Sequence, residues 1–204
     1  MSNLLALETL LDQRRVWRGQ PQGLPPSLQP TGHAALDAAL PAGGWPPSAL
    51  SEVLCAGPGH GELQLLWPTL ARLSQAGQSI VLVAPPYVPY APAWQAAGVD
   101  LRGLSVVQAG AAEGLWAAEQ CLRSGSCAAV LCWPQQVDDR ALRRLQVAAE
   151  TGQCLAFACR PLQAAINPSP AALRLLLDGP RGQVRVLKCR GGLAPSRPIA
   201  FRGQ

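Results

Sequence analysis

Short, almost continuously apolar runs alternate along this chain with longer amphipathic stretches, and this alternation limits the folds that the chain can adopt. An apolar run without polar alternation is typical of a strand covered on both faces of a sheet. We expect such strands at Ser51–Cys55, Ile80–Ala84, Leu104–Val107, Ala128–Trp133 and Cys154–Cys159, and helices between them at Glu62–Gln75, Ala91–Ala97, Ala111–Arg123 and Asp138–Glu150. Strands and helices in this order form right-handed crossovers. The sequence therefore predicts an α/β fold with a mostly parallel sheet flanked by helices.

The two ends of the chain follow other patterns. The segments Ala171–Asp178 and Gln183–Lys188 flank a Gly-Pro-Arg-Gly turn, which predicts a C-terminal β-hairpin that closes one edge of the sheet. Residues 191–204 are rich in Gly, Pro and Arg and predict a flexible basic tail. Leucines at helical spacing predict an N-terminal helix over residues 1–18, and several prolines predict an extended linker over residues 19–30. The main domain would then span residues 31–190.

A glycine-rich loop joins the first expected strand to the first long helix. Loops in this position bind phosphate through backbone amides, and the nucleotide-binding form ends in Gly-Lys followed by Ser or Thr. The corresponding loop here contains Ala56, Gly57, Gly61, Glu62 and Leu63, and the only lysine of the chain is the distant Lys188. A carboxylate thus replaces the phosphate-binding ammonium, and a leucine replaces the metal-binding hydroxyl. We expect a degenerate phosphate loop that holds no cofactor and serves as a tight turn, with Glu62 near the positive end of the helix.

Residues Pro30–Pro46 resemble the segment that precedes the phosphate loop in RecA recombinases. A Thr-Gly, a spaced Leu-Asp, an Ala-Leu and a Gly-Gly-x-Pro follow one another in the same order. Two further RecA features are missing, because Cys132-Trp133 stands where the central strand of RecA ends in an aspartate, and Pro85-Pro86-Tyr87 stands at the catalytic glutamate. The resemblance implies a RecA-like domain with no catalytic residue and no metal ligand.

Over nearly its whole length the chain resembles the ImuA family, whose members are RecA-like accessory proteins of SOS-induced translesion DNA synthesis. Shared positions include Glu52, the helix start at Gly61-Glu62-Leu63, Arg160-Pro161 and the C-terminal hairpin. This resemblance implies a cytoplasmic, non-enzymatic adaptor in mutagenic DNA repair. The partners it implies are an ImuB-like polymerase subunit, an error-prone replicative-type polymerase and RecA.

Residues from about Ser51 to Pro161 also resemble the SulA cell-division inhibitor family, which implies FtsZ as the partner. SulA-type chains lack the RecA-like segment Thr31–Pro46 and the long basic hairpin, so these two segments favour the ImuA-type interpretation. An FtsZ-binding division inhibitor remains the alternative. A RecA-like ATPase is a less favoured one, because it needs a lysine and a metal ligand from elsewhere.

Candidate partner-binding residues come mainly from the basic side chains. The net charge is +5, from sixteen arginines and one lysine, and arginine suits bidentate contacts with carboxylate or phosphate. The candidates are Trp17, Arg140, Arg143, Arg144, Arg181, Arg185, Lys188 and Arg190. Trp17 would act with the N-terminal helix, a candidate element for self-association. The cations would meet an acidic partner or contact DNA weakly, and plain solvated faces remain the alternative.

Other residue types suggest no further chemistry. Asp138 and Asp139 precede a helix and are expected to cap it rather than bind metal. His33 and His60 are isolated, with no Ser, Cys or acidic partners in a sequence arrangement that suggests catalysis. The seven cysteines lie mostly within apolar runs without metal-binding spacing. No apolar run is long enough to cross a bilayer, so we expect no membrane partner.

Overall fold

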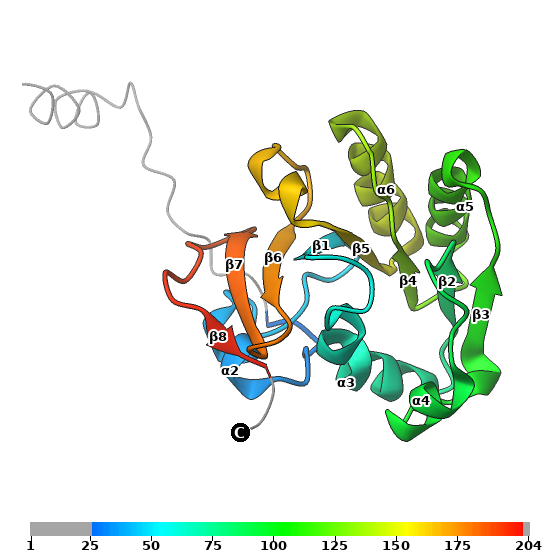
Figure 1. The fold of residues 1–204 in the computed structure, drawn as a ribbon, viewed down its shortest axis with the longest axis horizontal. Helices are drawn as coiled ribbons and strands as arrows, with labels where there is room; N and C mark the ends of the chain where they lie inside the picture. Colours follow the sequence, from blue (N-terminus) through cyan, green and yellow to red (C-terminus); the bar gives the residue numbers. More distant parts are fainter. Residues whose placement is uncertain (1–25, 202–204) are drawn as a thin grey trace, which may run out of the picture.

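The computed structural model describes residues 26–201, and these form an eight-stranded sheet with helices on both faces (Figure 1). The strands are β1 (Leu50–Cys55), β2 (Ile80–Val83), β3 (Leu104–Val107), β4 (Ala129–Cys132), β5 (Leu155–Pro161), β6 (Leu173–Asp178), β7 (Gln183–Cys189) and β8 (Ile199–Ala200). They lie in the order β3-β2-β4-β5-β1-β6-β7-β8. Every neighbouring pair from β3 to β6 is parallel, whereas β7 is antiparallel to both β6 and β8. The predicted mostly parallel sheet with its C-terminal hairpin is confirmed.

The helices form two layers, one on each face of the sheet. They are α2 (Ala34–Ala39), α3 (Glu62–Gln75), α4 (Ala91–Ala96), α5 (Ala111–Arg123) and α6 (Asp139–Gly152), with short 3-10 helices η1 (Leu101–Gly103) and η2 (Leu162–Ile166). One buried apolar cluster contains Leu36 of α2, Leu70 of α3 and Trp94 of α4. The other contains Leu122 of α5 and Leu145 of α6. The bounds of α3 and α5 are those that the sequence predicts.

Alternation along the strands decides which residues reach each layer. In β1, Val53 and Cys55 pack in the cluster of α3, while Leu50 packs in the cluster of α5 and α6. Because successive side chains of a strand point to opposite faces, Glu52 lies on the same face as Leu50. Glu52 is nevertheless fully buried. A charged side chain in this position needs partners, which the neighbouring strands supply.

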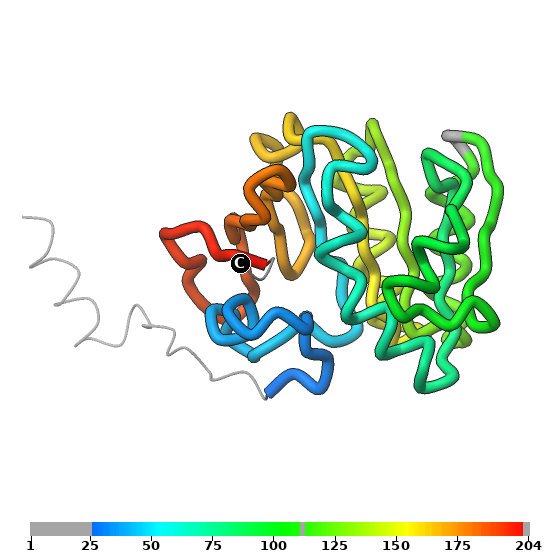
Figure 2. The backbone as a smooth tube through the Cα atoms, turned by 60° about the horizontal axis from the view of Figure 1, so that its bottom comes forward, coloured from blue at the N-terminus to red at the C-terminus, as the bar shows by residue number. Residues whose placement is uncertain are grey.

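The segment before β1 is part of the core. Trp45 is fully buried, and its indole N–H donates to Thr69 Oγ1 of α3 over 2.7 Å. The carboxylate of Asp37 accepts a hydrogen bond from the backbone N–H of Thr31 over 2.9 Å. Figure 2 shows this segment, in blue, beside the red C-terminal segment. The first and last described parts of the chain therefore pack together.

The C-terminal segment differs from the flexible tail that the sequence predicts over residues 191–204. Ile199–Ala200 form β8, which extends the sheet beyond the hairpin, so the hairpin does not form the edge. Phe201 is buried, and its ring meets the His33 ring edge-on with the centroids 5.7 Å apart. Burial of an aromatic ring stabilises this pairing, and residue composition alone does not reveal it. The predicted N-terminal helix, and the linker as far as residue 25, lie outside the described residues.

Within residues 26–201, no helix is both long enough and apolar enough to span a membrane.

Candidate functional site

The glycine-rich loop between β1 and α3 is a tight turn filled by its own carboxylate. Gly59 and Gly61 have φ angles of 81° and 108°, a region that favours glycine. Glu62, at the start of α3, is only 2% exposed, and its Oε1 accepts the backbone N–H of Gly59 over 2.6 Å. A loop amide that could have met phosphate is thus already bonded to a negative group. The residues of this loop do not fit a nucleoside triphosphate.

The carboxyl ends of β1, β2 and β4 lie at one edge of the sheet, because these strands are parallel within it. The segment after β2 contains Pro85, Pro86 and Pro89, with Tyr87 and Tyr90 exposed to 67% and 71%. The segment after β4 begins with Trp133. Neither β2 nor β4 is followed directly by a carboxylate.

A cleft with a volume of about 170 Å³ lies at this edge, and we name it the carboxyl-end cleft. Its main lining residues are Glu62, Trp67, Tyr87, Tyr90, Trp94 and Trp133. Trp67 and Trp94 meet edge-to-face, with ring centroids 4.7 Å apart. A second hollow of about 620 Å³ shares Pro86 and Trp133 with it. The carboxyl-end cleft is therefore an aromatic recess with one carboxylate residue in its lining, and no sequence pattern predicts it.

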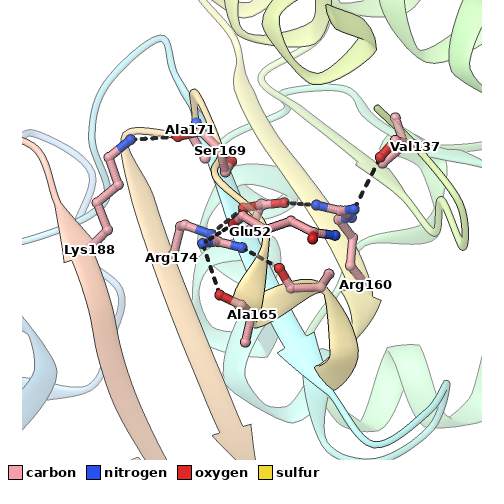
Figure 3. A network of polar contacts seen from close by, with 10 residues as sticks. Glu52, Val137, Arg160, Ala165, Ser169, Ala171, Arg174 and Lys188 are labelled. Carbon is pink, nitrogen blue, oxygen red and sulfur yellow. Dashed lines mark hydrogen bonds and ion pairs between the residues drawn. The ribbon is translucent and has the colours of Figure 1, made fainter. Parts of the chain in front are cut away.

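Glu52 is the centre of a buried ion triad behind this edge (Figure 3). Its Oε1 accepts from Arg160 Nη1 of β5 over 2.5 Å, and its Oε2 accepts from Arg174 Nε of β6 over 2.6 Å. All three side chains are at most 8% exposed. Two arginines around one carboxylate leave a net positive charge inside the protein, which is costly unless further acceptors are present.

Backbone carbonyls provide those acceptors and tie two loops to the sheet. Arg174 donates to the carbonyl oxygens of Ala164 over 2.8 Å and of Asn167 over 3.0 Å, both in or next to η2. Arg160 Nη2 makes a longer contact of 3.4 Å with the carbonyl oxygen of Val137. The triad thus holds the segments that follow β4 and β5. Glu52 and Arg160 are recognisable in the sequence as positions shared with the ImuA family, whereas Arg174 was not predicted, although an arginine within an apolar strand indicates a buried partner.

The predicted partner-binding cations are distributed over α6 and the hairpin, and most have partners within the protein. Arg143 pairs with Asp139 and Arg144 with Glu119, whereas Arg140 is exposed and has no ion pair among the described residues.

In the hairpin, Arg181 pairs with Asp178 over 3.1 Å and Arg190 with Glu150 over 3.5 Å. Lys188 donates to the carbonyl oxygen of Ser169 over 2.7 Å. Burial and the nearby Arg174 lower the pKa of Lys188. Arg185 is exposed and makes no ion pair within the described residues. Trp17 lies outside them.

Thiols and imidazoles form no reactive centre in the part of the chain that the structure describes. Burial raises the pKa of the Cys55 thiol to about 11 and those of Cys132 and Cys154 to about 12. Thiols with such pKa values are protonated and unreactive near neutral pH.

The remaining candidate side chains have structural contacts. His33 Nε2 lies 2.9 Å from the carbonyl oxygen of Leu65, which fixes the His33 ring. Asp138 caps α6 by accepting from the Ala141 N–H over 2.7 Å, as predicted. Among these residues no His, Cys, Asp or Glu side chains cluster to hold a metal.

Comparison with known proteins identifies a family and a similar solved structure. The family model described as cell division inhibitor SulA matches residues 49–156. The crystal structure of SulA from Pseudomonas aeruginosa aligns with 30% sequence identity and a TM-score of 0.48, over 56% of this chain and 99% of that chain. No curated protein matches. The family match ends within β5, so α2 and β6 to β8 lie outside it.

Proposed function

The chain belongs to the SulA family, whose model matches more than half of it, and from this premise we propose that it is a non-catalytic regulatory protein that binds other proteins. The observation that carries this proposal is Glu62, whose carboxylate takes the Gly59 amide in the loop where a nucleotide enzyme would hold phosphate. A RecA-like ATPase is disfavoured for the same reason. The absence of lysine and hydroxyl at the loop leaves nothing to bind the terminal phosphates or a metal ion.

The finer proposal is an ImuA-type accessory protein of SOS-induced translesion DNA synthesis, in the cytoplasm, with an ImuB-like polymerase subunit as its main partner. Two segments outside the family match support it. The RecA-like segment Thr31–Pro46 packs into the core through Leu36 and Trp45, and the hairpin contributes Val184 and Val186. Both are integral parts of the folded domain rather than appendages. On this basis we also propose that residues 31–190 form a RecA-like domain, to whose sheet and core β8 and Phe201 add.

The further contacts of this proposal stand on the resemblance alone. They are RecA, an error-prone replicative-type polymerase, self-association through residues 1–18 and a weak contact of the hairpin cations with DNA. The second candidate is an FtsZ-binding inhibitor of cell division, and the name of the matching family model favours it.

Parallel capture of purified ImuB and FtsZ by the full chain separates the two candidates. Deleting the hairpin is no test, because Val184, Val186 and Phe201 belong to the core. We use Arg185→Glu, which reverses an exposed charge in β7 that makes no ion pair within the described residues. The control is Arg102→Glu, which reverses an exposed charge paired with Asp100 just before β3, at the other edge of the sheet. We expect ImuB capture that falls at least about tenfold in Arg185→Glu and is unchanged in Arg102→Glu. Capture of FtsZ without ImuB would overturn the ImuA-type proposal in favour of the second candidate.

A further inference from the structure

Two residues that line the carboxyl-end cleft each carry a buried polar atom with no hydrogen-bond partner among the described residues. One is the carboxylate oxygen Oε2 of Glu62, a residue that is only 2% exposed. The other is the indole Nε1 of Trp133. Both residues line the same cleft. One atom is an acceptor with negative charge, and the other is a donor.

Unpaired buried polar atoms are uncommon, because each loses its bonds to water without replacement. The position of Glu62 at the start of α3 and the Gly59 amide stabilise its charge in part. They leave Oε2 without a donor. A cation seated in the cleft would remove this deficit, and a carbonyl oxygen beside it would satisfy the Trp133 N–H.

The other walls of the cleft suit the same kind of ligand. Trp67, Trp94, Tyr87 and Tyr90 present aromatic surface, which attracts cations and receives the flat guanidinium group well. The volume of about 170 Å³ is below the roughly 300–1,000 Å³ of most small-molecule sites, so it suits one side chain rather than a nucleotide. Arginine combines the charge, the planar shape and an apolar stem.

We propose that the carboxyl-end cleft binds one arginine side chain of a partner protein, with the guanidinium against Glu62 and a partner carbonyl oxygen accepting from the Trp133 indole. This inference rests on the proposed protein-binding function and specifies the chemistry of one contact. It places the partner's anchor at the edge where a nucleotide enzyme of similar architecture would hold phosphate. Here the loop would receive a cation instead of an anion, because Glu62 gives it a negative charge at the position where a nucleotide-binding loop has a lysine.

The test is a titration of the full chain with N-acetyl-arginine-N-methylamide, observed through the six tryptophan indole N–H signals in NMR spectra. The uncharged isostere N-acetyl-citrulline-N-methylamide is the matched ligand, and Trp133→Phe assigns the Trp133 signal. We expect the arginine probe to shift the Trp133 signal saturably and to bind roughly tenfold or more tightly than the citrulline probe, as for a bond to a charged acceptor. Equal affinity of the two probes, or shifts confined to other tryptophans, would overturn the proposal.

Glu62→Gln tests the carboxylate directly, since it keeps the acceptor for Gly59 and removes only the charge. We expect it to lower the affinity for the arginine probe to that of the citrulline probe. Glu113→Gln is the control, because Glu113 is also a first-turn glutamate but is exposed. An unchanged affinity in Glu62→Gln, with the tryptophan spectrum preserved, would refute the site.

The outcome is separable from that of the proposed function. Arginine binding without capture of ImuB would leave the site in place and remove the ImuA-type role. If the protein captures ImuB but does not bind the arginine probe, the ImuA-type role stands and the proposed arginine site is refuted.

Discussion

At the scale of single residues, Glu52 has the largest effect that we expect on stability. Its carboxylate is shared by Arg160 and Arg174, and all three are buried. Glu52→Gln leaves two buried arginines without a counter-charge, which costs about 3–5 kcal/mol in similar cases. Urea unfolding followed by circular dichroism measures the loss. Asp178→Asn, which breaks an exposed pair with Arg181, should cost less than about 1 kcal/mol. If Glu52→Gln lowers the free energy of unfolding by no more than Asp178→Asn does, the triad does not stabilise the sheet.

Because the thiols are buried, we expect the free energy of unfolding to fall at alkaline pH. Burial raises the pKa of Cys132 from 9.0 to about 12, so the folded state keeps a proton that the unfolded state releases above pH 9. This stabilisation is complete below pH 9 and is lost as the pH rises toward 12, at up to about 1.4 kcal/mol per pH unit. The free energy of unfolding of Cys132→Ala should therefore fall less steeply between pH 8.5 and 10.5 than that of the unchanged protein. Parallel slopes for the two proteins would contradict this assignment.

At the scale of elements, the turn of the hairpin packs against the glycine-rich loop. A Cβ atom on Gly179 would lie 1.8 Å from the carbonyl oxygen of His60, so the two backbones must separate to admit one. We expect Gly179→Ala to destabilise the protein by about 1–3 kcal/mol in urea unfolding. Gly110→Ala is the matched control, since a Cβ there meets nothing within 4 Å and its φ of −67° suits alanine. Equal stability of the two variants would show that the hairpin can move away from the loop without cost.

At the scale of the whole molecule, the two ends of the described chain depend on each other. Phe201 is buried beside His33, and the segment that carries it completes the sheet as β8. Phe201→Ala should cost about 3–5 kcal/mol, as for other buried aromatic side chains. Leu193→Ala should cost almost nothing, because Leu193 is 95% exposed. Thermal unfolding of the two variants beside the unchanged chain is the measurement. A melting temperature of Phe201→Ala equal to that of Leu193→Ala would mean that the C-terminal segment is not part of the folded unit.

The sequence by itself determined the main helices and strands from β1 to β7 and the residues that the loop lacks. Helical and strand periodicity are local properties, which is why α3 and α5 appear at their predicted bounds. The presence of Glu62 at the lysine position is likewise visible in the sequence, and it predicts that the loop does not bind nucleotide.

Only the tertiary structure decided which distant residues meet. Placing β1 between β5 and β6 brings Glu52 to Arg174, 122 positions later, and composition does not encode that order of strands. The same packing buries Phe201, which lies in a segment that the sequence predicts to be flexible. It also places Glu62, Trp67, Tyr87 and Trp133 around one cleft. Burial and long-range pairing depend on the whole arrangement of the chain, whereas sequence patterns report neighbours along it.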